Sequence, residues 1–94
     1  MRKDIVLTRR HENLLNDLLE TVAFEGYAHV PKWRLLRWYE FEHFVATIRR
    51  DLRDRWNTLV TQQLGWEEVP TLWIAEGKGG DIVLIHDDTF PEED

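Results

Sequence analysis

Apolar residues recur at intervals of three and four in the first quarter of the chain, which is the spacing of one face of an α-helix. The members of this stripe are Leu14, Leu15, Leu18, Leu19 and Val22. Thr8 precedes the stripe and can cap the first turn with its hydroxyl, and Gly26 follows it where a left-handed residue commonly ends a helix. The pattern therefore predicts a helix over residues 9–24.

The chain between this helix and Gly65 predicts two further helices. Residues 27–30 form a short extended link, because a proline disfavours helical angles in the residue before it, and Pro31 suits the first turn of a new helix. No glycine or proline follows until Gly65, and a single helix over that run would be about 50 Å long. A small domain cannot hold it, so we expect a break at residues 38–40, between a short helix (31–38) and a long helix (41–64).

The long helix is amphipathic. Its apolar face is formed by Phe41, Phe44, Val45, Ile48, Leu52, Trp56, Leu59, Val60 and Leu64. Its opposite face carries His43, Thr47, Arg50, Arg53, Asp54, Asn57 and Thr61. We expect the apolar face to pack against the first helix.

Two β-rich runs follow Pro70. These runs are Thr-Leu-Trp-Ile-Ala-Glu at 71–76 and Asp-Ile-Val-Leu-Ile-His at 81–86, and they flank the sequence Gly77-Lys78-Gly79-Gly80. A short glycine-rich loop between two such runs is typical of a β-hairpin. The fold class predicted from these elements is α+β, with three helices followed by a β-hairpin.

This order of elements resembles the winged-helix family, in which a helix-turn-helix is followed by a two-stranded wing. The resemblance spans residues 9–86 and is one of topology. It implies that the extended link after the first helix supplies a third strand, and that the domain acts on nucleic acid. We therefore predict one winged-helix-like domain over residues 1–86, followed by an acidic tail over residues 87–94.

Composition and charge narrow the class of protein. The 94 residues suffice for one domain, and 43% hydrophobic with 32% charged residues is a globular balance. The chain has no cysteine, no apolar run of membrane-spanning length and no signal-peptide core, so we expect a cytoplasmic protein without a membrane partner. The net charge is −6, but residues 1–65 hold 11 of the 12 basic side chains and only 9 of the 18 acidic ones. An acidic end does not prevent the basic part from approaching nucleic acid.

The polar face of the long helix is the candidate nucleic-acid surface. Arginine and asparagine form two-pronged hydrogen bonds with guanine and adenine edges in a major groove. Candidate contacts are Arg49, Arg50, Arg53 and Asn57 on this helix, Lys32, Arg34 and Arg37 on the short helix, and Lys78 at the tip of the wing. A solvated helix face is the competing interpretation, because Arg50–Asp54 and Asp51–Arg55 have the spacing of helical ion pairs. The leading hypothesis is a regulator of DNA transactions.

An aromatic cluster supports a different function. The segment 33–41 holds more large apolar side chains than one face of a short helix can bury. Exposed members of Trp33, Trp38 and Tyr39 would then form a partner or dimer surface. The alternative hypothesis is a protein-binding adaptor or inhibitor that acts through these aromatics and the acidic end.

No catalytic or cofactor-binding constellation is present in the sequence. Serine and cysteine nucleophiles are excluded because the chain contains neither residue. Glu40-x-x-His43 offers two metal ligands where several more are needed, and Glu76-Gly77-Lys78 matches only half of a metal-dependent nuclease motif. We therefore predict a non-enzymatic domain without metal or cofactor.

Overall fold

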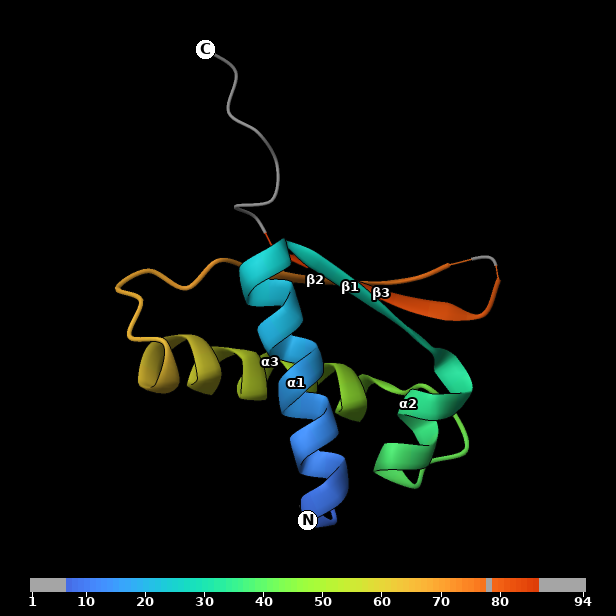
Figure 1. Cartoon of the computed structure of the whole chain (residues 1–94). Coiled ribbons are helices and arrows are strands. Elements are labelled where there is room, and N and C mark those ends of the chain that lie inside the picture. The colour runs from blue at the N-terminus through green and yellow to red at the C-terminus, as the bar shows by residue number, and fades with distance from the viewer. Residues whose placement is uncertain (1–6, 78, 87–94) are drawn as a thin grey trace.

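The computed structural model describes residues 7–77 and 79–86, which fold into three α-helices and a three-stranded antiparallel sheet (Figure 1). The elements in chain order are α1 (Arg9–Glu25), β1 (Tyr27–Pro31), α2 (Lys32–Tyr39), α3 (Ala46–Thr58), a π-helical turn (Leu59–Gln63), β2 (Leu72–Glu76) and β3 (Asp81–His86). The prediction of an α+β domain is confirmed. The strict order of helices followed by a hairpin is corrected, because β1 lies between α1 and α2 and pairs with the hairpin.

The first helix begins and ends as its sequence predicts. The Thr8 hydroxyl accepts a hydrogen bond from the backbone N–H of His11 at 3.2 Å. Gly26 has a φ of 96°, and its N–H donates to the carbonyl of Val22. A side chain at this left-handed position would strain the backbone, which explains the glycine.

The break between α2 and α3 is longer than predicted. Glu40 ends α2 with a φ of 58°, and its N–H donates to the carbonyls of Leu36 and Arg37. The chain then runs without helix until Val45, the extended N-cap of α3. The predicted helical start at residue 41 is therefore wrong, because Phe41 and Phe44 pack against the core from this loop and not from a helix. Pro31 was predicted to lie in the first turn of the short helix. It is instead the last residue of β1 and the N-cap of α2, which begins at Lys32.

The last part of the predicted long helix is π-helical. The N–H of Leu64 donates to the carbonyl of Leu59, five residues back, at 2.9 Å. This wider turn places both Leu59 and Val60 in the core. Gly65 then ends the helical run with a φ of 70°.

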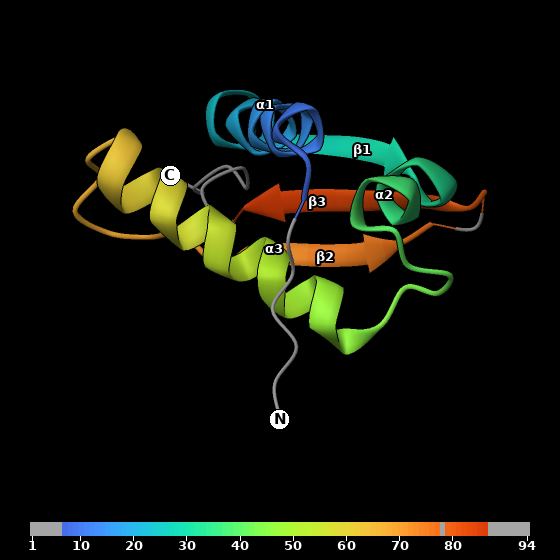
Figure 2. The same cartoon turned by 90° about the horizontal axis from the view of Figure 1, so that it is seen from below.

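The sheet has the order β1-β3-β2, and one of its faces is covered by helices. Figure 1 shows the helices on one side of the strands, with the start of α1 farthest from the sheet. Viewed from the helical side in Figure 2, α1 lies next to β1 and α3 next to β2. The inward apolar residues of the three strands are Ala28, Val30, Leu72, Ile74, Ile82 and Leu84, and all are buried, as is His86 at the end of β3. They close the core over the apolar faces of α1 and α3. The long helical run was predicted to pack on the first helix, and it lies beside α1 at the π-helical turn.

Candidate nucleic-acid interface

Helix α3 presents one face to the core and the opposite face to solvent. Ile48, Leu52 and Trp56 are spaced at one helical turn and are fully buried. The same periodicity turns Arg50, Arg53 and Asn57 outward, where all three are exposed. The three candidate residues with the strongest case in the sequence thus share one open face.

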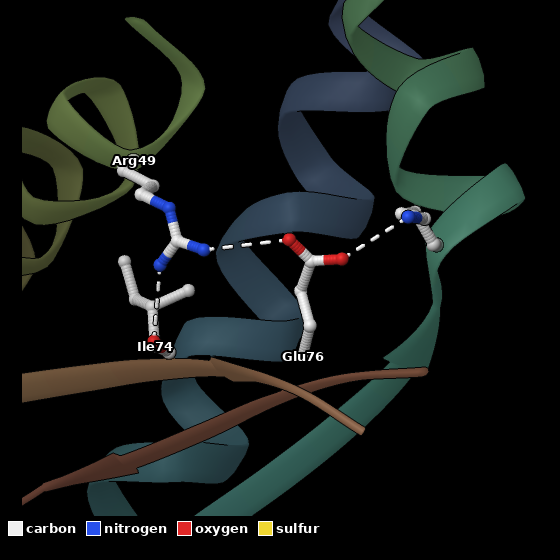
Figure 3. Close-up of polar contacts among 4 residues, drawn as sticks. Arg49, Ile74 and Glu76 are labelled. Atoms are coloured by element: carbon white, nitrogen blue, oxygen red, sulfur yellow. Dashed lines mark hydrogen bonds and ion pairs between the residues drawn. The ribbon is translucent and has the colours of Figure 1, made fainter. Parts of the chain in front are cut away.

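Arg49 lies beside this face but is engaged within the fold. Its guanidinium donates to the backbone carbonyl of Ile74 on β2 at 3.1 Å and pairs with the carboxylate of Glu76 at 3.5 Å (Figure 3). It also lies over the ring of Phe44, 4.7 Å from the ring centre. A side chain held by three groups on the same molecule is a clamp between α3 and β2, and it has few donors left for a ligand.

Glu76 also pairs with Lys32, a second residue predicted to contact nucleic acid. The other oxygen of its carboxylate accepts from the ammonium group of Lys32 at 3.0 Å, so one acid bridges the first turns of α2 and α3 (Figure 3). The bridge also ties both helices to the end of β2. It neutralises part of the positive charge of Lys32 and Arg49, both of which were predicted to contact nucleic acid.

Asp51 and Arg55 form the second internal cluster on α3. The Asp51 carboxylate accepts hydrogen bonds from the Tyr39 hydroxyl and from Nε of Arg55, each at 2.6 Å. Burial, together with the hydrogen bond to Asp51, raises the pKa of Tyr39 far above its ordinary value. Burial alone lowers the pKa of Arg55, but the hydrogen bond and negative charge of Asp51 outweigh it and raise that pKa. This predicted helical ion pair therefore exists, and it fastens α2 to α3.

The other predicted helical ion pair does not form. Arg50 and Asp54 have the required spacing, but no ion pair within 4.0 Å joins Arg50 or Arg53 to an acid in the described part of the chain. The four arginines of α3 therefore divide evenly. Arg49 and Arg55 hold the fold together, whereas Arg50 and Arg53 keep their donors and charge available to solvent.

The remaining basic candidates are less concentrated. Arg34 and Arg37 are exposed on α2, and the Arg34 guanidinium lies over the Trp33 ring at 5.2 Å from its centre. Lys78, the predicted wing contact, and the predicted acidic tail at 87–94 lie outside the described residues.

The predicted aromatic surface is reduced to one residue. Trp38 and Tyr39 are buried in the core, so only Trp33, which is 60% exposed, can meet a partner from this cluster. The density of aromatics did not reveal which ring faces outward, because the short α2 buries two rings and exposes the third.

A row of apolar side chains on the outer face of the sheet was missed in the sequence analysis. The strand register places Tyr27, Ile85 and Trp73 side by side across β1, β3 and β2. Tyr27 and Trp73 are each more than half exposed, on the face opposite the helices. The alternation along each predicted strand was the available signal, but the register between strands was needed to join the residues into a row.

Neither a metal centre nor a membrane span is found among the described residues. No three His, Cys, Asp or Glu side chains there come together as a group that could hold a metal ion. No helix in residues 7–77 and 79–86 is long and apolar enough to cross a membrane.

Comparison with protein-family models, curated proteins and solved structures finds no match to this chain.

Proposed function

We propose that this chain is a winged-helix-like domain that binds nucleic acid through the outer face of α3 and acts as a regulator of DNA transactions. The order of elements supports it, because an antiparallel hairpin follows two consecutive helices and pairs with a strand that precedes them. In this arrangement α3 is the helix that enters a groove, and the β2–β3 hairpin is the wing.

The observation that carries the proposal is the division of the arginines on α3. A helix face that serves only for solubility commonly pairs its charges at a spacing of four residues. Here that pairing is used internally by Asp51 and Arg55, while Arg50 and Arg53 remain without an acidic partner among the described residues. Two adjacent, unneutralised guanidinium groups on an exposed helix face are suited to phosphate oxygens and to guanine edges.

Asn57 extends the same face by one helical turn beyond Arg53. Its side chain is exposed, and an amide can donate to and accept from an adenine edge at the same time. We assign phosphate and guanine contacts to Arg50 and Arg53, and an adenine contact to Asn57. Lys32 and Arg49 hold the reading helix against the wing and do not contact the ligand in this assignment.

The experiment is a fluorescence-anisotropy titration of labelled duplex and single-stranded DNA and RNA, run at low salt and repeated at rising salt. The double variant Arg50→Ala/Arg53→Ala should weaken binding and flatten the slope of log K against log salt by up to about two units. The variant Arg50→Lys/Arg53→Lys keeps the charge and should keep the slope, but it loses two-pronged base contacts and therefore sequence preference. Arg9→Ala, which removes an exposed charge from α1, is the positional control and should have a smaller effect.

Binding that is absent at low ionic strength for every nucleic acid would refute the proposal. So would binding that does not weaken as salt rises, because charge-driven association releases counterions and must respond to salt.

A second candidate function is protein binding, which the exposed row on the outer sheet face favours. Tyr27, Ile85 and Trp73 form a continuous apolar strip, and aromatic side chains are enriched in protein interfaces. A second copy of the chain is the simplest partner. Sedimentation velocity over rising concentration should then show association that Tyr27→Thr removes and Arg50→Ala/Arg53→Ala leaves intact.

A further inference from the structure

A hollow of about 500 Å³ lies between the first turns of α1 and helix α2. Its lining residues are Arg10, His11, Leu14, Trp33, Arg34, Arg37 and Trp38. This volume is within the range of small-molecule sites, which are concave and combine apolar walls with a few polar groups. Here Leu14 and the tryptophans supply the walls, and the polar groups are almost all cationic.

The charge of the hollow is unbalanced. Three guanidinium groups line it, and no lining residue is acidic. None of the three forms an ion pair with an acid in the described residues, unlike Lys32, which is also on α2 and pairs with Glu76. Arg34 and Arg37 also lie three positions apart on α2, where like charges repel. An anion seated between them would remove this repulsion.

Helix α1 adds to the positive potential. Arg10 is in its first turn, where the aligned backbone dipoles already place a partial positive charge. His11 follows in the same turn, and its Nδ1 is buried without a hydrogen-bond partner among the described residues. The hollow thus collects donors for an anion from both helices.

Trp33 gives the hollow a flat apolar surface beside the cations. The indole is 60% exposed although it lines the hollow, and the Arg34 guanidinium lies 5.2 Å from its ring centre. An exposed indole next to a guanidinium is the combination on which nucleobases stack in proteins that bind single strands. An inorganic anion alone would make no use of this ring.

We propose that this hollow binds a nucleotide, with its phosphate groups held by Arg10, Arg34 and Arg37 and its base stacked on Trp33. The nucleotide is either a free nucleoside phosphate or one unit of a single strand, since both offer the same phosphate and base. This site is on α1 and α2 and is separate from the outer face of α3, so it does not depend on the function proposed above.

The test is isothermal titration calorimetry of the full chain with adenosine 5′-diphosphate, inorganic pyrophosphate and adenosine. The diphosphate should bind most tightly, because it alone engages both the cations and the ring. Arg34→Gln/Arg37→Gln should weaken it at least tenfold, and Trp33→Ala should weaken it roughly tenfold while leaving pyrophosphate affinity unchanged. Circular dichroism spectra and thermal midpoints of both variants establish that they fold.

Two further arms distinguish the sources and locate the site. A ten-nucleotide single strand that binds much more tightly than adenosine diphosphate, with the same sensitivity to Trp33→Ala, identifies a strand as the ligand, and the reverse order identifies a free nucleotide. Arg50→Ala/Arg53→Ala should leave diphosphate affinity unchanged, so failure of the α3 proposal does not affect this one. Equal affinity for pyrophosphate and adenosine diphosphate, indifference to the α2 variants, or no heat at millimolar ligand would each overturn the assignment.

Discussion

The indole Nε1–H of Trp56 donates to the backbone carbonyl of Pro70 over 2.8 Å, and both groups are buried. The bond joins the last turn of α3 to the segment that leads into β2. It satisfies an indole that carries a large share of the core, and it fixes where the chain returns from the π-helical turn to the sheet. The position of the hairpin relative to α3 therefore depends on one side chain of that helix.

Replacing Trp56 with phenylalanine tests this bond. The smaller ring keeps much of the apolar contact but leaves the Pro70 carbonyl buried without its donor, which costs about 1–3 kcal/mol. The lost volume adds to that value. The free energy of unfolding, measured by urea denaturation, should fall by at least this amount. Trp33→Phe on the surface is the matched control, and it should change stability by less than about 0.5 kcal/mol.

Glu40 offers a stabilising substitution. It ends α2 with a φ of 58°, a conformation that glycine adopts without strain and glutamate does not. Glu40→Gly should therefore raise the free energy of unfolding by up to about 1 kcal/mol. Glu42→Gly is the control, because Glu42 is exposed in the same loop and does not have a positive φ. Equal effects of the two substitutions would show that the left-handed cap is not a source of strain.

The parts of the fold that the sequence predicts correctly are those with a local cause. Thr8 and Gly26 bound α1, and the glycine-rich loop sets the hairpin, because capping and turn geometry act over a few residues. The left-handed turn at Glu40 and the π-helical turn after Thr58 have no such signal. The turn at Glu40 lets Phe41 and Phe44 pack against the core from a loop, and the π-helical turn brings the adjacent residues Leu59 and Val60 into the core. Both are requirements of tertiary packing that override the helical pattern.

The candidate site divides in the same way. Arg49 and Arg50 are neighbours of the same type, and a rotation of about 100° between them decides that one clamps β2 and the other faces solvent. Periodicity predicted the outward direction of Arg50 correctly. It could not predict the role of Arg49, because its partner Glu76 is on a different element and bridges to Lys32, 44 positions away. Contacts across such separations require the assembled fold.

Tyr39 should make stability depend on pH in the alkaline range. Its pKa is raised in the folded state by burial and by the hydrogen bond to Asp51, whereas an unfolded tyrosine ionises near pH 10. The contribution of neutral Tyr39 to the free energy of unfolding is therefore complete below pH 10. As pH rises above 10 this contribution is lost, by up to about 1.4 kcal/mol per pH unit. Tyr39→Phe lacks the hydrogen bond to Asp51 and should be less stable than wild type at pH 8. Because phenylalanine does not ionise, the variant should not lose this stability above pH 10.

Urea unfolding of both proteins at pH 8, 10 and 11 checks the effect. The difference in free energy between wild type and Tyr39→Phe should shrink from pH 10 to pH 11. Curves that stay parallel over this range would show that Tyr39 ionises as easily in the folded state as in the unfolded one.

Glu76→Gln should increase affinity for nucleic acid. The substitution removes the one carboxylate that neutralises both Lys32 and Arg49, and so it adds a unit of positive charge beside the face of α3 that carries Arg50 and Arg53. Stability should fall by no more than about 1 kcal/mol, because the paired groups are each about one-third exposed or more and ion pairs of this kind contribute little. Binding to duplex DNA at low salt should tighten, and the slope of log K against log salt should steepen by up to about one unit.

Glu25→Gln at the end of α1 makes the same change of charge far from α3 along the chain, and it separates a local effect from one of net charge. If both substitutions tighten binding equally, net charge governs association and the face of α3 has no special role. If only Glu76→Gln tightens it, the bridge among β2, α2 and α3 restrains a nucleic-acid surface, because it withholds two cations from the ligand.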